Sequence, residues 1–325
     1  MAPLRNRSLR EPKRSRACPR RALSALLLLQ GAVQPVAGQA DLRAPPRDST
    51  VVVLLGTGMP YPDPEAQGPA TAVVVGPRVL LFDAGPGVMR QLAAAGLPVR
   101  GEPVTAAFLT HLHSDHTLGL PDLILTSWVM GRTAPLRLIG PPGTRAMADH
   151  LIEAWREDIL VRTRGLEHAA PGGYQVDVRE TRGGVVYDSA GIRVTAIPVP
   201  HGSWPWAFAY RVDGPGKTVV ISGDTRPSEA LVRAARGADV LIHEVYPESR
   251  VAPEPRQGGG DWPRYLRSFH TSDRELGRLA RRIRPGLLVL YHIVRMGATD
   301  EEILAAIRAG GYRGRTVIGR DLDRY

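Results

Sequence analysis

The segment Thr110-His111-Leu112-His113-Ser114-Asp115-His116 places four residues of metal-ligand type within six positions, directly after an apolar run. In an extended segment residues two apart point to the same side, so His111 and His113 can hold one metal ion. The turn that follows redirects Asp115 and His116 toward a second ion. A single histidine is more often a core or surface group, but four such residues at this spacing predict a metal site.

Composition limits the other ways in which this chain could bind a metal or catalyse a reaction. The chain has 325 residues, of which 43% are hydrophobic and 23% charged, so it is long enough for one large domain with a buried core. Its only cysteine is Cys18. If the first 40 residues are removed, the mature chain has no thiol, which excludes disulfides, thiolate catalysis and cysteine-bound zinc. Any metal ion must then be held by histidine and carboxylate.

Residues 1–40 have the pattern of a secretory signal peptide. They hold eight basic residues against Glu11 and so contribute +7 of the net charge of +10, which leaves about +3 for the remainder. An apolar run over 22–33 and small residues at 36–40 follow the basic stretch. A membrane anchor is the alternative, but about 12 apolar residues are fewer than the roughly 20 that a spanning helix needs. We therefore predict a signal peptide at 1–40, no membrane span, and export to the periplasm or the medium.

Strands and helices alternate along the rest of the chain. Its opening is β-rich, with strands expected at 50–55, 71–75 and 78–82. Alternation over the whole length predicts a single α/β layered domain at 41–325, without repeats. The polar segment 251–268 is interpreted as a loop, either a lid over a site or an idle surface insertion. Further strands are expected at 104–110, 192–198, 207–212, 218–222, 240–243 and 287–291, and helices at 88–95, 145–158, 228–236, 273–283 and from 299.

Three more residues of ligand type stand where expected strands end. They are His201 after Val199-Pro200, Asp224 after Ser222-Gly223, and His292 after Tyr291. Taken alone, each would more often cap a turn. Two metal ions, however, need about seven protein ligands, and one carboxylate can bridge ions roughly 3.5–4 Å apart. Together with the four clustered residues, these three complete such a set.

Five motifs carry a resemblance to a known family: His-X-His-X-Asp-His at 111–116, Leu81-Phe82-Asp83-Ala84-Gly85, His201, Ser222-Gly223-Asp224-Thr225-Arg226, and His292. Through them the chain resembles the metallo-β-lactamase superfamily over roughly residues 51–294. The resemblance implies a four-layer αββα sandwich, a metallo-β-lactamase-fold hydrolase, with the metal ions at one edge of the paired sheets. It also implies how the ligands divide: His111, His113 and His201 on one metal, Asp115, His116 and His292 on the other, and Asp224 bridging both.

Two further motifs resemble the ribonuclease Z branch of that superfamily. They are the run from Gly223 to Glu244, which ends in Ala238-Asp239-Val240-Leu241-Ile242-His243-Glu244, and the segment Phe269-His270-Thr271-Ser272 before an expected helix. In that branch the histidine at the position of His270 is implied to protonate the leaving oxygen, and the glutamate at Glu244 to orient that histidine. An imidazole with a pKa near neutral suits this role.

The chain departs from ribonuclease Z in one place. The short form of that enzyme has a long Gly/Pro-rich arm that grips tRNA between the third histidine and the bridging aspartate, but here only 22 residues lie between His201 and Asp224. The segments Gly68-Pro69-Ala70-Thr71-Ala72-Val73 and Leu118-Gly119-Leu120-Pro121-Asp122-Leu123 resemble instead a secreted, arylsulfatase-like branch that lacks the arm. Export agrees with this, because precursor tRNA is not found outside the cytoplasm. Because residues 41–325 carry little net positive charge, we expect no strong nucleic-acid binding.

On these grounds we expect a secreted dinuclear zinc hydrolase that cleaves a small sulfate or phosphate ester, although the ligands also suit other divalent metals. A hydroxide held between the two zinc ions would attack the ester and Asp115 would steer its proton, with His270 and Glu244 as the other catalytic residues. The partner is then a small-molecule ester, and a homodimer is compatible with the sequence. The alternatives are a ribonuclease Z-like phosphodiesterase that processes tRNA 3′ ends and a non-catalytic metal-binding protein.

Three residues beside these motifs each have two interpretations. Asp83 either orients a ligand imidazole or stabilises the turn before Gly85. Trp204 and Trp206, close to His201, either stack on a flat aryl group of the substrate or pack within a strand.

Overall fold

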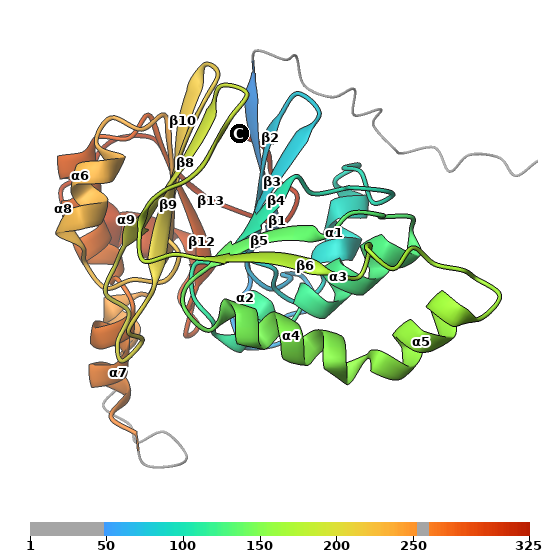
Figure 1. Ribbon diagram of the computed structural model, residues 1–325. Helices are drawn as coiled ribbons and strands as arrows, with labels where there is room; N and C mark the ends of the chain where they lie inside the picture. Colours follow the sequence, from blue (N-terminus) through green and yellow to red (C-terminus); the bar gives the residue numbers. More distant parts are fainter. Residues whose placement is uncertain (1–48, 252–259) are drawn as a thin grey trace, which may run out of the picture. The chain divides into compact units, whose positions relative to one another are not determined.

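The computed structural model describes residues 49–251 and 260–325 (Figure 1). The predicted signal peptide at 1–40 lies outside the described residues. Within the described part, the helices are all too short or too polar to cross a membrane. The described residues form two β-sheets with helices packed on the outer side of each.

Sheet 1 is built from the first half of the chain and has six strands. Its first three strands pair antiparallel and the later ones parallel. Residues of β1 and β2 are buried almost without interruption, as expected for strands covered on both faces. In spatial order the strands are β1 (Thr50–Gly56), β2 (Ala70–Val75), β3 (Arg78–Phe82), β4 (Ala106–Phe108), β5 (Leu136–Gly140) and β6 (Val176–Glu180).

Sheet 2 is built from the second half and has seven strands. The strands from β7 to β10 pair antiparallel, and those from β10 to β13 pair parallel. In spatial order they are β13 (Thr316–Ile318), β12 (Leu287–Ile293), β11 (Val240–Val245), β10 (Lys217–Ile221), β9 (Phe208–Gly214), β8 (Ile192–Pro198) and β7 (Gly184–Ser189).

Helices cover the outer face of each sheet (Figure 1). Those of the first half are α1 (Val88–Ala94), α2 (Ser114–Thr117), α3 (Leu120–Val129), α4 (Thr144–Ala154) and α5 (Arg156–Arg164). The second half contains α6 (Glu229–Ala235), the short 3-10 turn η1 (Glu248–Arg250), α7 (Trp262–Phe269), α8 (Asp273–Ile283) and α9 (Asp300–Ala309), of which α7 projects away from the sheets (Figure 1). Apolar residues of α1, α3 and α4 form one core with sheet 1, and those of α6, α8 and α9 form another with sheet 2.

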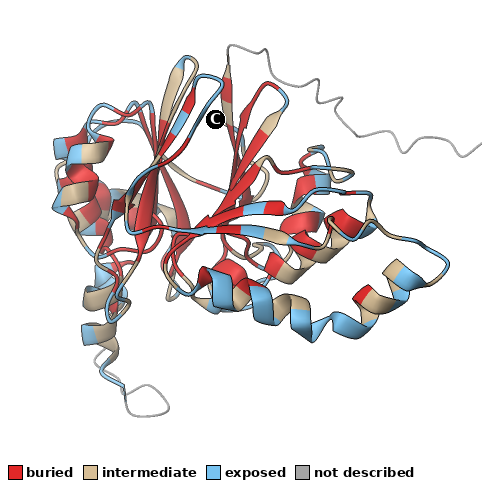
Figure 2. Ribbon diagram, in the orientation of Figure 1, coloured by how far each residue is buried: buried red, intermediate tan, exposed pale blue. Residues whose placement is uncertain are grey.

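A third core fills the space between the two sheets. It contains Phe82 and Phe108 from sheet 1, whose rings stack 4.9 Å apart, and Tyr210 from sheet 2, whose ring lies 5.4 Å from that of Phe82. The strands are buried and the outer sides of the helices exposed (Figure 2). The order helices, sheet, sheet, helices confirms the predicted αββα sandwich.

The segment predicted as a loop at 251–268 is partly helical. Residues 252–259 lie outside the described part, but α7 occupies Trp262–Phe269. It begins with Asp261, whose side chain accepts a hydrogen bond from the Arg264 amide, and with a proline in its first turn. The prediction missed this helix because eight residues give too few turns for a clear apolar period.

Candidate metal centre

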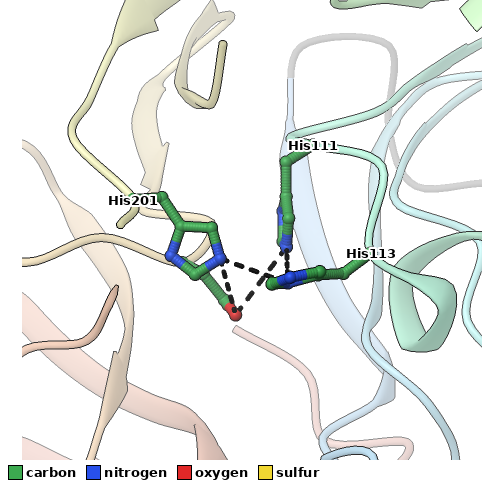
Figure 3. A group of neighbouring side chains, drawn as sticks. His111, His113 and His201 are labelled. Atoms are coloured by element: carbon green, nitrogen blue, oxygen red, sulfur yellow. Dashed lines mark hydrogen bonds and ion pairs between the residues drawn. The ribbon is translucent and has the colours of Figure 1, made fainter. Parts of the chain in front are cut away.

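Three imidazoles converge beyond the ends of β4 and β8 (Figure 3). His113 Nδ1 lies 2.9 Å from His111 Nε2 and 3.2 Å from His201 Nε2. A zinc ion with bonds of about 2.0–2.1 Å in tetrahedral geometry holds its nitrogen ligands about 3.3 Å apart, which is close to these separations. The three nitrogens and one oxygen of Asp224 all lie within 4.8 Å of one another. This group has the residues and spacing of a site for one metal ion.

A second group lies beside the first and contains Asp115, His116 and His292. Asp115 Oδ2 is 3.2 Å from His292 Nε2 and 3.5 Å from His116 Nε2. The ligand atom of His116 is buried and has no hydrogen-bond partner among the described residues, as expected of a group that serves a cation. The two groups divide the ligands as the resemblance implied. The residues fit two metal ions, although their number and kind stay predictions.

Asp224 contacts both groups. Its Oδ1 lies 3.5 Å from His116 Nε2, and its Oδ2 lies 3.6 Å from His292 Nε2 and 3.9 Å from His111 Nε2. Burial would raise the pKa of Asp224, but the nearby imidazoles, His292 foremost, outweigh burial and hold this pKa well below its usual value. The carboxylate is therefore charged and faces both groups, as a bridging ligand must.

The turn before Asp224 needs a glycine. Gly223 has φ of +56°, and a Cβ there would lie 2.7 Å from the Phe208 carbonyl oxygen and 2.8 Å from Thr110 Cβ. This close approach brings the end of β10 against the residue that precedes His111, and so brings together ligands from both sheets.

Burial keeps two ligands of the first group neutral. It lowers the pKa of His111 well below the usual value and that of His201 to about 4. A neutral imidazole has a free nitrogen lone pair, which is the form that binds a metal. The Phe269 carbonyl oxygen accepts from His201 Nδ1 at 2.7 Å, so Nε2 faces the other ligands.

Asp83 organises ligands of both groups. One carboxylate oxygen accepts from the Thr110 amide at 2.7 Å, and the other lies 2.8 Å from both the Thr110 hydroxyl and His116 Nδ1. The same hydroxyl is 2.9 Å from His111 Nδ1. These contacts turn Nε2 of both imidazoles toward the site, which supports the interpretation of Asp83 as a residue that orients ligands. Its φ of +59° is one that aspartate tolerates better than most residues.

Trp204 and Trp206, the two tryptophans near His201, are not among the residues that line the open cavity leading to the metal-ligand groups. The Trp204 indole nitrogen lies 2.7 Å from His113 Nε2, which leaves His113 Nδ1 facing the other ligands. Trp206 packs against the core between the sheets and carries the Arg182 guanidinium 5.5 Å from its ring centre. The structure therefore favours packing over aryl stacking for both residues.

His270 and Glu244 lie side by side next to the ligands. His270 Nδ1 is 3.3 Å from Glu244 Oε2 and 3.9 Å from Asp224 Oδ2. Glu244 is held by the amides of Thr271 and Thr225, which donate to its Oε1 at 2.9 and 3.3 Å. Burial alone would lower the pKa of His270, but Glu244 outweighs it, so this pKa lies above the usual value. In the described part neither His270 Nδ1 nor Glu244 Oε2 forms a hydrogen bond, so Glu244 acts on His270 as a nearby negative charge, and the pair is a candidate for a proton donor and the carboxylate that orients it.

An open cavity of about 670 Å³ leads to these residues. Its floor includes Asp115, Asp224, His270 and His292, and its walls are largely apolar. The other lining residues are Met59, Pro60, Tyr61, Pro62, His113, Arg250, Trp262, Tyr265, Leu266, Val294 and Met296.

One wall of the cavity is a stack of aromatic rings on α7. The rings of Trp262 and Tyr265 are 5.1 Å apart and nearly parallel, those of Tyr265 and Phe269 are 4.4 Å apart, and Phe269 lies 5.0 Å from the His201 ring. Tyr61, which is 70% exposed, faces the same cavity. Sequence reasoning did not find Tyr61 as a site residue; the only signal was a tyrosine between two prolines in a turn-rich segment.

Comparison with known proteins identifies the family and the fold. The family profile described as the beta-lactamase superfamily domain matches residues 78–293. A protein of Mycobacterium bovis named ribonuclease Z is 36% identical over 280 residues, which cover 84% of this chain and 96% of that protein. A ribonuclease Z of Mycolicibacterium paratuberculosis is 39% identical with the same coverage. A metallo-β-lactamase fold protein from Bacillus subtilis superposes with a TM-score of 0.66 at 18% identity, over 85% of this chain and 98% of that one.

These relatives contradict the predicted partner, a small-molecule ester without strong nucleic-acid binding. Proteins named ribonuclease Z match nearly their whole length to this chain, and they favour the ribonuclease alternative over the arylsulfatase-like interpretation. The error came from the missing arm between His201 and Asp224. The alignment covers 96% of the ribonuclease Z from Mycobacterium bovis, so that relative cannot contain a long arm that is missing from this chain. The absence of that arm therefore does not separate this chain from proteins of that name.

Proposed function

The chain belongs to the metallo-β-lactamase superfamily, in its ribonuclease Z branch, and on that premise we propose that it cleaves RNA and removes 3′ extensions from precursor tRNA. It is a metal-dependent hydrolase. The observation that carries the proposal is the identity of 36–39% to proteins named ribonuclease Z over almost their full length. The ligand set and the His270–Glu244 pair supply groups that phosphodiester hydrolysis needs.

We propose two zinc ions as the cofactors, held by the two ligand groups and joined by Asp224. Metal ions in such a site lower the pKa of a bound water and place positive charge next to the phosphate. In the first group, the neutral, oriented imidazoles of His111 and His201 support this assignment, as does the charged, buried carboxylate of Asp224. Zinc suits a ligand set of nitrogen and carboxylate oxygen without cysteine.

The protein's own residues have separate tasks in this proposal. Asp115 lies on the cavity floor within 3.5 Å of two imidazoles, where its carboxylate can accept the proton of the attacking water. His270 donates a proton to the ribose oxygen that leaves, and Glu244 holds the ring with Nδ1 toward itself. The apolar walls exclude water and offer flat ring surfaces to the bases next to the cleaved bond.

The test uses the purified full-length protein and a precursor tRNA with a short 3′ extension. We expect cleavage at one position, loss of cleavage on removal of metal by a chelator, and recovery when zinc is restored. Asp224→Ala should lose cleavage, whereas Asp188→Ala, which removes an exposed aspartate paired with Arg193, should keep it. Turnover of aryl sulfates with no cleavage of any RNA would show the proposal to be wrong.

A further inference from the structure

Three exposed arginines form a stripe along α8. Arg274, Arg278 and Arg281 are four and three positions apart, so they lie on one side of the helix. The side that faces sheet 2 consists of buried residues such as Leu276, Leu279, Ala280 and Ile283. Figure 2 shows the outer side of this helix layer as exposed. We call the three residues the α8 arginine stripe.

Among the described residues, the α8 arginine stripe has no acidic partner in an ion pair. Across the described ranges, no carboxylate lies within 4.0 Å of these three guanidinium groups. Other arginines on the same side of the protein are neutralised: Arg282 pairs with Glu229 at 2.6 Å, and Arg250 pairs with Glu302 at 2.6 Å. The stripe therefore carries a local positive charge that the small net charge of the domain does not reveal.

The end of α9 extends this basic surface. Helices α8 and α9 touch closely, since a Cβ on Gly277 would lie 2.2 Å from the Ile307 carbonyl oxygen. A Cβ on Gly311, just past α9, would lie 3.3 Å from Arg281 Cδ. Exposed Arg308 and Arg313 flank this glycine, and in the described part neither forms an ion pair.

The stripe starts beside the metal centre and leads away from it. Helix α8 begins at Asp273, three positions after His270. At 1.5 Å per residue, Arg274 and Arg281 are about 10 Å apart along the axis. Arg274 is therefore the member of the stripe that is nearest in the chain to His270, and Arg281 is the most distant.

We propose that the α8 arginine stripe binds the phosphate backbone of the double-helical part of the RNA substrate. This rests on the proposed function, which makes the substrate a polynucleotide. A cavity of about 670 Å³ has the size of a small-ligand site, so most of a tRNA must lie outside it. Guanidinium groups bind phosphate in a fork geometry and give affinity without sequence preference.

The experiment compares two triple variants of the full-length zinc-loaded enzyme. R274Q/R278Q/R281Q removes the stripe. R90Q/R100Q/R164Q removes three exposed arginines that have no ion pair in the described part and belong to the sheet 1 half. Between 50 and 200 mM salt we measure two properties: KM and kcat for precursor tRNA, and the affinity for a fluorescent RNA hairpin. We also measure the turnover of bis(4-nitrophenyl) phosphate.

Loss of three phosphate contacts should lower the slope of log affinity against log salt by about 2.7, at about 0.9 per contact. At 0.1 M salt the corresponding loss of hairpin affinity is at most about 500-fold. The stripe variant should show a rise in KM and a shallower slope, with unchanged turnover of the small diester. The control variant should resemble wild type.

Three results separate the possible failures. Equal salt slopes for the stripe variant, the control variant and wild type would refute the stripe as the binding surface. A wild-type enzyme that binds the hairpin through the stripe but cleaves no RNA would refute the proposed function and leave the surface standing. A wild-type enzyme that does not bind the hairpin at all would refute the stripe.

Discussion

The substitution Glu244→Gln tests how the proton donor is oriented. The glutamine keeps an oxygen that can accept from the Thr271 and Thr225 amides, so the buried side chain stays in place. The NH2 of the glutamine replaces Glu244 Oε2, the oxygen that lies 3.3 Å from His270 Nδ1. The change removes one negative charge from this contact. It also places the glutamine NH2, a hydrogen-bond donor, opposite His270 Nδ1, and Nδ1 can accept from it only when Nδ1 itself carries no proton.

The size of the effect follows from this distance. An opposite charge within about 4–6 Å shifts a pKa by about 1–3 units, and each unit changes the protonated fraction about tenfold once the pH exceeds the pKa. We therefore expect the pKa of His270 to fall and kcat on RNA to decrease by about 10- to 1000-fold. His270→Ala removes the donor altogether and should lower turnover by about 10²- to 10⁴-fold with the zinc content unchanged.

The assay varies the leaving group. Single-turnover rates are measured on RNA, whose leaving ribose oxygen needs a proton, and on bis(4-nitrophenyl) phosphate, whose nitrophenolate largely does not. The defect should shrink on the second substrate for both variants, while Glu275→Gln, which removes an acidic group held outside the cavity by Ser272, should match wild type on both. An equal loss on both substrates, or loss of zinc, would refute His270 as the proton donor.

The metal centre and the amino terminus give further expectations. Elemental analysis should find about two zinc ions per chain, and Asp224→Ala should weaken both; one ion in wild type, or a fully loaded variant, would exclude a bridged site. Asp83→Ala leaves the buried Thr110 amide and the His116 imidazole without this partner. It should therefore lower the affinity for metal by about 10- to 100-fold and lower the free energy of unfolding in urea titrations by about 1–3 kcal/mol. An unchanged metal affinity would contradict the role of Asp83 in orienting ligands. Cleavage of residues 1–40 on export stays a prediction, and it competes with the proposed function because precursor tRNA is cytoplasmic. Intact mass and thiol titration of protein from its native host decide between them: a full-length chain that keeps Cys18 agrees with tRNA processing, whereas a shortened chain without Cys18 would mean that an exported enzyme acts on another substrate.

The parts of the site that are contiguous in sequence could be predicted well. His111, His113, Asp115 and His116 follow one strand and its turn, so local geometry alone places them together. The more distant His201, Asp224 and His292 were candidates because they follow expected strands and complete the ligand count, but how they divide between two metal ions came only from the resemblance, because their meeting depends on how two sheets pack. The structure brings all seven side chains into the two groups that the resemblance implied.

The cavity walls could not be predicted from the sequence. Tyr61 comes from a turn-rich loop after β1, and Trp262 from a helix of eight residues inside a polar segment. Neither segment has an apolar period that marks it as part of a site. Both side chains line the cavity because the loop and the helix that carry them come together in the tertiary structure.

The incorrect partner prediction came from using net charge in place of charge distribution. A domain with about +3 overall looks like a poor ligand for RNA, but a phosphate backbone responds to the field within a Debye length, about 8–10 Å at physiological salt. Some arginines of this chain are neutralised by neighbouring carboxylates, as Arg282 is by Glu229, whereas those of the α8 arginine stripe have no ion pair in the described part. The total charge averages these two populations. Under the proposed role of the stripe, RNA binding depends on where unpaired arginines lie relative to the cleavage site, so R274Q/R278Q/R281Q should impair RNA binding far more than R90Q/R100Q/R164Q, which changes the net charge equally.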